Sequence, residues 1–261
     1  YGSETLMSHF NKKMKYKCDH LFIFGEAYRK FYKRYIQNFD EIDIIGSFRS
    51  NFSKKKITKD LNKDRVNYIS QFRFNHPAIN IQVKIVKFLD KYAYQNNLKL
   101  FLYCKYNSNI GMSKTLDRKL KEKEFFNKLN LKSKFKLVYS DYINGNFEKL
   151  MDQSLVVTND STLGYELFGR GKKVAFFTIR RSKRYNVTFG WPAKYSHGKF
   201  WTNNFSETKF KNILDWMRKI KKEEWLRYSK KIRKNLISSD IGNLILKKKI
   251  DNLIKKEKQN D

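Results

Sequence analysis

Five short apolar runs alternate along the chain with longer stretches in which apolar residues recur every three or four positions. The runs consist mostly of β-branched, leucine and aromatic residues, as expected for strands buried on both faces. They occupy residues 66–69, 98–103, 135–139, 155–158 and 173–179. The intervening segments have the spacing of amphipathic helices, most clearly at 79–94. This alternation predicts an α/β fold with a mainly parallel, Rossmann-like sheet and helices on both of its faces.

The segment before residue 65 predicts a second, smaller unit. Its expected elements are a basic helix at 9–19, a strand at 20–24, a helix at 27–39 and a strand at 42–45. We interpret residues 1–50 as the tail of an N-terminal Rossmann-like domain. That domain is expected to be truncated, because the chain opens with Tyr1 instead of Met and reads like the middle of a protein.

Three further segments complete the predicted domain organisation. Residues 51–64 are lysine-rich and lack an apolar rhythm, as expected of a linker. Residues 65–235 form the main Rossmann-like domain, which ends in a basic helix predicted at 207–235. Residues 236–261 form a basic C-terminal segment with a helix predicted at 241–256.

The segment 155–179 predicts a strand, a tight loop, a helix and a second strand. Four turn and N-cap residues follow the first strand, namely Asn159, Asp160, Ser161 and Thr162. A helix that begins at the carboxyl end of a strand offers free N–H groups and a positive dipole end to an anion such as a diphosphate. Glu166 lies one turn further on, where its carboxylate is placed to accept hydrogen bonds from ribose hydroxyls. The alternative interpretation is an ordinary capped helix with a solvated Glu166.

Polar side chains also follow three of the other predicted strands. They are Ser70, Gln71 and Arg73 after the first strand, Tyr139, Ser140 and Asp141 after the third, and Arg180 and Arg181 after the fifth. The carboxyl ends of strands in a doubly wound sheet converge on one rim. Each set alone is ordinary turn chemistry. Several sets on one rim, with guanidinium groups among them, favour a phosphate-bearing ligand.

The formal net charge is +32, from 57 Lys and Arg against 25 Asp and Glu. Such a charge is typical of proteins that bind nucleic acid or an anionic membrane surface. The lysines are spread along the whole chain, however, and the accompanying excess of Asn, Ile, Phe and Tyr is what AT-rich codon usage produces in any protein. Codon usage and selection for an anionic partner both remain open as explanations.

Other kinds of site have little support in the sequence. Cys18 and Cys104 lack metal or disulfide spacing, which fits a reducing cytosol and predicts no bound metal. We find no nucleophile elbow, Walker motif or carboxylate pair. His197 lies in a glycine- and tryptophan-rich loop that either covers a cleft or packs on its own aromatics. The lysine-rich run 219–234 either lies on anionic lipid or packs back on the sheet with a solvated basic face.

Three segments of the sequence carry a resemblance to a known family. They are VVTNDSTLGYELFGRGKKVAFF, the preceding VYSD and the later FGWPAKYSHGKFWTN. In these segments the chain resembles the nucleotide-binding half of the GT-B glycosyltransferases. More narrowly, it resembles the bacterial surface-carbohydrate biosynthesis transferases, which are related to the UDP-GlcNAc 2-epimerase and glycerophosphotransferase groups.

The resemblance implies roles for the residues at the strand ends. Ser161 and Thr162 would hold the donor phosphates, and Glu166 would hold the ribose. The loop at 139–141 would lie near the base, and 70–71 would face the interdomain cleft. Together with these residues, the expected donor-binding set contains Asn159, Asp160, Gly164, Arg73, Arg180 and Arg181.

The chain also departs from the family pattern. Asn159 stands seven residues before Glu166, where some retaining enzymes have a second glutamate. Related enzymes have a His-Gly turn near the reaction centre. Gly2 and Ser3 are our catalytic candidates as its counterpart, although no histidine accompanies them. Asp19 and Asp141 could act as bases, but no second carboxylate is paired with either of them.

The resemblance implies a glycosyltransferase-like enzyme that binds a nucleotide-activated sugar and contributes to a surface polysaccharide. The expected partners are a nucleotide-sugar donor and a saccharide or lipid-linked acceptor, in the cytoplasm or at the anionic inner face of the membrane. No cofactor or metal is expected, because helix N–H groups and arginines would stabilise the leaving group. The alternatives are a nucleotide-sugar 2-epimerase or hydrolase of the same fold, and a non-catalytic basic domain that binds nucleic acid or membrane. Scattered lysines and the lack of an RNA-binding motif disfavour nucleic acid.

Overall fold

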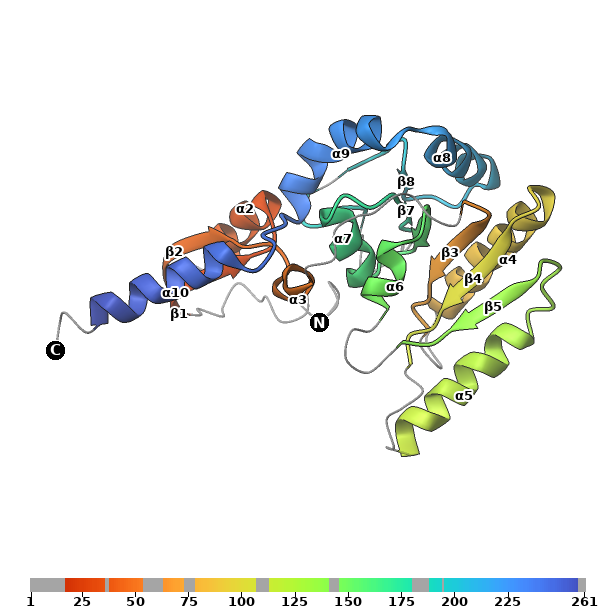
Figure 1. The fold of residues 1–261 in the computed structure, drawn as a ribbon, viewed down its shortest axis with the longest axis horizontal. Coiled ribbons are helices and arrows are strands. Elements are labelled where there is room, and N and C mark those ends of the chain that lie inside the picture. The colour runs from red at the N-terminus through yellow and green to blue at the C-terminus, as the bar shows by residue number, and fades with distance from the viewer. Residues whose placement is uncertain are drawn as a thin grey trace.

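The computed structural model describes residues 17–35, 38–53, 63–72, 78–106, 113–140, 146–179, 188–193 and 195–257. Within these ranges the chain forms a small βαβ unit near the N-terminus and a larger α/β unit with a six-stranded sheet (Figure 1). None of the helices in the described ranges is both long enough and apolar enough to cross a membrane.

The larger unit is built on a fully parallel sheet with the strand order β5-β4-β3-β6-β7-β8. Its strands are β3 (Arg65–Ile69), β4 (Lys99–Tyr103), β5 (Phe135–Val138), β6 (Val156–Thr158), β7 (Val174–Phe177) and β8 (Trp201–Thr202). From β3 the chain adds β4 and β5 on one side, then returns to add β6, β7 and β8 on the other. The point between β3 and β6 is therefore the topological switch point, where doubly wound sheets bind ligands. The predicted Rossmann-like parallel sheet is confirmed.

Helices cover both faces of this sheet. They are α4 (Ala78–Gln95), α5 (Ser113–Asn127), α6 (Phe147–Met151), α7 (Thr162–Gly169), α8 (Glu207–Lys219) and α9 (Lys222–Leu236). Successive side chains of a strand point to opposite faces, so two neighbours in β7 identify the layers. Phe176 contacts Phe168 of α7, with ring centroids 5.7 Å apart. Phe177 stacks on Phe210 of α8 at 3.8 Å and contacts Phe88 of α4.

The small unit consists of β1 (Lys17–Ile23), α2 (Glu26–Tyr35), β2 (Asn38–Ile44) and the short helix α3 (Phe48–Phe52). β1 and β2 pair in parallel, so α2 is the crossover helix of a βαβ unit. The C-terminal helix α10 (Leu244–Glu257) returns from the end of α9 and lies beside this sheet (Figure 1). The first and last described segments of the chain are therefore packed together.

Two residues of the small unit hold this return in place. The Asn51 amide Nδ2 donates to the Ile45 carbonyl at 2.8 Å and to Asn243 Oδ1 at 3.1 Å. Gly46 has a φ of +71°, and a Cβ atom there would lie 1.9 Å from the Ser238 carbonyl oxygen. Only glycine combines this backbone conformation with such a close crossing of two chain segments.

Several predicted boundaries in the small unit are wrong. The helix expected at 9–19 is contradicted at 17–19, which pair with β2 as the start of β1, while residues 1–16 lie outside the described ranges. The helix expected at 27–39 ends at Tyr35, because β2 already begins at Asn38. The expected linker 51–64 starts inside α3, and residues 54–62 are not described.

The helix predicted at 207–235 is interrupted. α8 ends at Lys219, and the extended backbone of the C-cap residue Ile220 (φ −60°, ψ 133°) separates it from α9. The buried Lys173 ammonium donates a 2.7 Å hydrogen bond to the Ile220 carbonyl and so satisfies a group that the helix end leaves free. Trp225 of α9 is buried and donates to the Gly171 carbonyl at 2.9 Å. The basic run 219–234 thus packs back on the larger unit, and its contact with lipid stays a prediction.

Candidate functional site

The structure brings two of the predicted residue sets to the switch point. β3 and β6 end side by side, because Ile69 pairs with Thr158 in the parallel register. The loops that follow these strands begin with Ser70 and Asn159, and α7 starts at Thr162 on the same edge of the sheet. The predicted convergence of strand-end residues is therefore observed for these two loops.

The N-terminus of α7 is suited to an anion. Ser161 is the N-cap residue with an extended backbone, but its hydroxyl makes no capping hydrogen bond. The Ser161 N–H donates instead to Thr158 Oγ1 at 3.1 Å, which turns the loop tightly against β6. The first helical turn contains no acidic side chain. Ser161 thus leaves the N–H groups of this turn without a bond from their N-cap hydroxyl, and the turn itself contains no carboxylate that would repel an anion at the positive end of the helix dipole.

Gly164 sets how closely α7 approaches β6. A Cβ atom at this position would lie 2.6 Å from Thr158 Cγ2. Gly164 is buried, so the structure supports a packing role for it, and its predicted contact with a donor stays a prediction.

Asn159 places a buried polar atom at the end of β6. Its side chain is buried, and Oδ1 has no hydrogen-bond partner among the described residues. Its backbone carbonyl accepts a 3.0 Å hydrogen bond from Thr178 Oγ1, which fixes the loop. Leaving a buried acceptor without a donor costs about 1–3 kcal/mol. A ligand that donates a hydrogen bond here would recover this cost.

Asp160 faces two tyrosines, one from each unit. It hydrogen bonds to the Tyr165 hydroxyl, which also accepts the Gly190 N–H at 3.0 Å. Burial, reinforced by the charge of Asp160, raises the pKa of Tyr165. Burial, with Tyr32 and Asp160 nearby, also raises the pKa of Tyr28 in α2. Both phenols therefore stay protonated at neutral pH, and the loop before α7 adjoins the small unit.

Glu166 lies at the junction between α7 and the small unit. Only 4% of its side chain is exposed, and both carboxylate oxygens have partners. Ser47 Oγ donates to Oε1 at 2.8 Å, and Arg49 Nη2 lies 2.5 Å from Oε2. Arg170 adds a second link, because its Nη1 donates to the Ser50 carbonyl at 2.6 Å. A contact between Glu166 and ribose stays a prediction.

Ser70 and Gln71 belong to a buried polar network. Ser70 Oγ donates to Glu122 Oε1 at 2.5 Å and accepts from Gln82 Nε2 at 3.2 Å, while the Gln71 N–H donates to Gln82 Oε1 at 3.0 Å. Glu122 of α5 also accepts the Lys105 N–H at 3.1 Å. Burial raises the pKa of Glu122, although these hydrogen bonds oppose the shift. These two predicted residues are thus engaged in joining the ends of β3 and β4 to α5.

Tyr139 and Ser140 follow β5 and are separated from α7 by β4 and β3. The Tyr139 hydroxyl is buried and without a hydrogen-bond partner in the described part of the chain. Burial raises the pKa of Tyr139 to about 12, and Lys119 lies over its ring at 4.8 Å from the centroid. Ser140 is half-buried. A contact of this loop with a nucleotide base stays a prediction.

Six predicted site residues fall outside the described residues. They are Gly2, Ser3, Arg73, Asp141, Arg180 and Arg181. Sequence reasoning in turn misses Ser47, Arg49 and Glu122. Glu122 stands three and four residues before Phe125 and Phe126, so helical spacing offered a signal that it shares their face, although its charge made a solvated position the simpler expectation. Ser47 and Arg49 follow the end of β2, which is the position that marks the other candidate residues, and this was a usable signal.

The described part of the tryptophan-rich loop packs on aromatic side chains. Trp191 contacts Phe31 of α2 with centroids 4.9 Å apart, and the buried Trp201 stacks on Phe189 at 4.8 Å. His197 is exposed, and its Nδ1 lies 3.0 Å from Ser196 Oγ. These contacts favour the packing interpretation of the loop.

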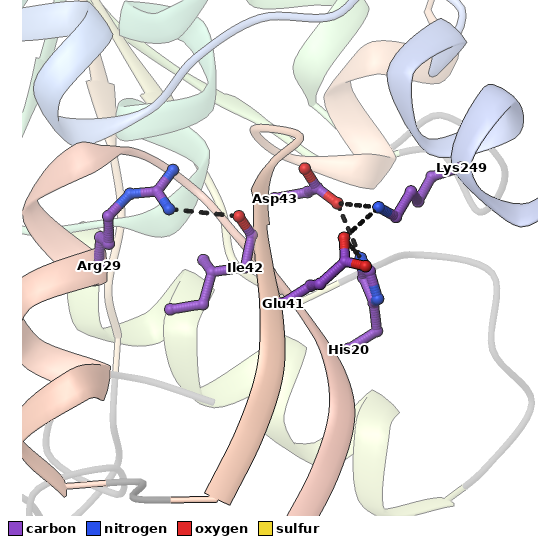
Figure 2. A network of polar contacts seen from close by, with 6 residues as sticks. All are labelled: His20, Arg29, Glu41, Ile42, Asp43 and Lys249. Carbon is purple, nitrogen blue, oxygen red and sulfur yellow. Dashed lines mark hydrogen bonds and ion pairs between the residues drawn. The ribbon is translucent and has the colours of Figure 1, made fainter. Parts of the chain in front are cut away.

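A polar cluster joins α10 to the small sheet (Figure 2). His20 Nε2 lies 2.8 Å from Asp43 Oδ2 and 3.8 Å from Glu41 Oε2, and Lys249 contacts both carboxylates. The hydrogen bond from His20, helped by the charge of Lys249 and opposed by partial burial, lowers the pKa of Asp43. Histidine and carboxylate groups of this kind bind divalent metals. The Lys249 ammonium already supplies a cation here, so the cluster fastens α10, and the expected absence of a metal stays a prediction.

Comparisons with known proteins bear on the fold and the family. Residues 3–258 match the model of a family described as putative O-antigen biosynthesis protein. A search of curated proteins gave no match. Among solved structures, the chain is similar to a mutant of S. aureus TarM in complex with fondaparinux, α-GlcNAc-glycerol and UDP, with 16% identity and a TM-score of 0.51 over 90% of this chain and 43% of TarM.

Two other solved structures are similar at lower scores. The sucrose-phosphate synthase of Thermosynechococcus elongatus is 13% identical, with a TM-score of 0.49 over 97% of this chain and 62% of the synthase. The Methanocaldococcus jannaschii UDP-GlcNAc 2-epimerase in complex with UDP-GlcNAc and UDP is 15% identical, with a TM-score of 0.47 over 82% of this chain and 60% of the epimerase. The chain thus spans only 43% to 62% of the lengths of these three proteins. The similarity to TarM confirms the predicted GT-B-like α/β fold.

Proposed function

Because the chain belongs to the putative O-antigen biosynthesis protein family, we propose that it binds a nucleotide-activated sugar and takes part in building a bacterial surface polysaccharide. The proposed reaction is the transfer of a sugar from its nucleotide diphosphate to a saccharide or lipid-linked acceptor. The donor would lie at the switch point between β3 and β6, with its diphosphate at the N-terminus of α7.

The observation that carries this proposal is the state of the α7 N-terminus. It stands at the switch point, its N-cap hydroxyl on Ser161 makes no capping bond, and its first turn has no acidic residue. The unpartnered Oδ1 of Asn159 lies in the same loop. A helix N-terminus that could donate to an anion and an unpartnered acceptor for a hydroxyl or N–H group thus lie in the same short loop.

The chemistry follows from where charge develops. The bond between the anomeric carbon and the diphosphate oxygen breaks, and the leaving diphosphate gains negative charge. Preorganised N–H groups at a helix N-terminus stabilise such charge without reorganising. The acceptor oxygen forms the new bond to the anomeric carbon and loses its proton to a base. Arg73, Arg180 and Arg181 remain our proposed additional cations, and no described residue is assigned as the base.

The proposal is tested by nucleotide binding to variants that add a negative charge at α7. Thr162 is exposed at the first position of the helix, so Thr162→Glu should fold and should repel a diphosphate. We expect calorimetry to show at least about tenfold weaker binding of UDP, equivalent to about 1.4 kcal/mol.

The matched control is Thr208→Glu, which adds the same charge at an exposed position in the first turn of α8. It should leave the affinity for UDP within about twofold, because α8 starts away from the switch point. Equal weakening in both variants would indicate a general charge effect and would overturn the assignment of α7. Failure of the unaltered protein to bind any nucleoside diphosphate would overturn the proposed function.

A further inference from the structure

Arg49 presents a guanidinium group beside the first turns of α7. Its Nη2 is fixed to Glu166 Oε2 at 2.5 Å, yet 69% of its side chain is exposed. Glu166 is the only ion-pair partner of Arg49 among the described residues. Arginine has five N–H donors, so the described residues leave most of the donors of Arg49 available to a ligand.

The position of Arg49 relative to α7 follows from helix geometry. A long helical side chain points back toward the helix N-terminus and covers the preceding turn. Glu166 is the fifth residue of α7, so its carboxylate lies over the turn that begins at Thr162. Arg49, which binds this carboxylate, is therefore held near the N–H groups that we propose for the donor diphosphate.

The short helix α3, which carries Arg49, is fixed on both sides of this residue. Ser47 Oγ donates to Glu166 and also accepts the Ser50 N–H at 3.4 Å as the N-cap of α3. Arg170 then binds the Ser50 carbonyl from the far end of α7. The backbone on either side of Arg49 is thus attached to the same helix that carries the proposed phosphate site.

We infer that Arg49 binds the donor diphosphate and that Glu166 is a positioning residue that orients the Arg49 guanidinium. This inference rests on the proposed function and adds a cation from the small unit to a site otherwise built by the larger unit. Arginine suits this role because its planar fork forms paired, charge-assisted hydrogen bonds with phosphate oxygens.

The competing assignment of Glu166 to ribose predicts a different dependence on the ligand. If Glu166 binds ribose hydroxyls, its loss should weaken every ligand that contains ribose, including a nucleoside without phosphate. If Glu166 orients Arg49, its loss should weaken only ligands that carry phosphate, and it should do so in the same pattern as the loss of Arg49.

The experiment measures the affinities of uridine, UMP and UDP by calorimetry for five forms of the protein. They are the unaltered chain, Arg49→Gln, Arg49→Lys, Glu166→Gln and the control Arg227→Gln, which removes an exposed arginine from α9. We expect Arg49→Gln and Glu166→Gln each to weaken UDP binding at least about tenfold, as expected for losing a charge-assisted contact. Uridine binding should change by less than about twofold. Arg49→Lys should be intermediate, and the control should match the unaltered chain.

Three results would overturn the inference. They are unchanged UDP affinity in Arg49→Gln, weakened uridine binding in Glu166→Gln, and an equal loss for all three ligands in both variants, which would indicate a structural role. If the unaltered chain binds UDP and any of these three results is obtained, only the role of Arg49 and Glu166 is contradicted, and the proposed function is not. Absence of UDP binding by the unaltered chain would remove the proposed function as well.

Discussion

The hydroxyl of Ser70 donates a 2.5 Å hydrogen bond to the buried carboxylate of Glu122, which ties the end of β3 to α5. The same carboxylate accepts the N–H groups of Lys105 and Tyr106 after β4. We expect Glu122→Ala to lower the free energy of unfolding by about 2–4 kcal/mol, because several buried donors lose their acceptor. Urea denaturation followed by circular dichroism measures this change.

The control for this substitution is Glu124→Ala on the same helix. Glu124 is exposed, and its contact with Lys128 is 3.8 Å long. Its loss should change the free energy of unfolding by less than about 0.5 kcal/mol. Similar effects of the two substitutions would show that the Glu122 network contributes little to stability.

Stability should also depend on pH through Glu122. Burial raises the pKa of this carboxyl above its ordinary value of 4.5, although hydrogen bonds from Ser70 and two backbone N–H groups oppose the shift. The folded state therefore binds this proton more tightly than the unfolded chain. The stability that this bound proton adds is greatest below pH 4.5 and is lost as the pH rises through the pKa of Glu122 in the folded state.

Glu122→Gln removes this titration. The free energy of unfolding of the unaltered chain, relative to that of the variant, should decline as the pH is raised from about 4 to 7. Denaturant titrations at half-unit pH steps measure the difference. A relative stability that rises with pH would contradict the expected direction.

Close packing at Gly164 predicts a specific rescue. Gly164→Ala would place a methyl group 2.6 Å from Thr158 Cγ2 and should cost about 1–3 kcal/mol through overpacking. Adding Thr158→Ser removes Cγ2 but keeps the hydroxyl that accepts the Ser161 N–H. The double variant should therefore recover roughly half of the loss, measured as a coupling energy in a double-mutant cycle. Additive losses would contradict a direct clash between these two residues.

Lys249 is expected to hold α10 against the small sheet. It contacts Glu41 and Asp43, and the hydrogen bond to Glu41 raises its pKa. Lys249→Ala should make amide hydrogen exchange in α10 roughly two- to fivefold faster, the range for an exposed ion pair. Lys248→Ala, which removes an exposed neighbouring lysine, should leave the exchange rates unchanged. High salt should reduce the difference between the two variants. Equal amide exchange rates in Lys249→Ala and Lys248→Ala would show that contacts other than Lys249 hold α10 in place.

The parts of the fold that sequence patterns predict are those set by local spacing. The segment 155–179 shows this most clearly, because an apolar run, N-cap residues, a helical stripe and a glycine stop follow one another directly. β6, α7 and β7 lie inside that segment as predicted, with boundaries within two residues. The parallel order of the sheet follows from the same alternation, because a helix between two strands brings them back in the same direction.

The parts that sequence patterns do not predict depend on contacts between distant residues. At the break between α8 and α9, the Ile220 carbonyl accepts a hydrogen bond from Lys173, which is 47 residues away in the sequence. The partner of Glu166 is Arg49, 117 residues earlier in the chain. Local spacing contains no information about such pairs, so a glutamate on the exposed side of a predicted helix and one bound to an arginine look the same in the sequence.

The return of α10 to the small sheet has a consequence for the order of events during synthesis. Asn51 and Asn243, which join α3 to the start of α10, are separated by 192 residues. At about 5–20 residues per second, the ribosome needs roughly 10–40 s to supply the second partner after the first. A two-stranded sheet is marginally stable without further packing. β1 and β2 thus reach their final surroundings only after the 192 residues between Asn51 and Asn243 have been made, and until then they are exposed to chaperones and proteases.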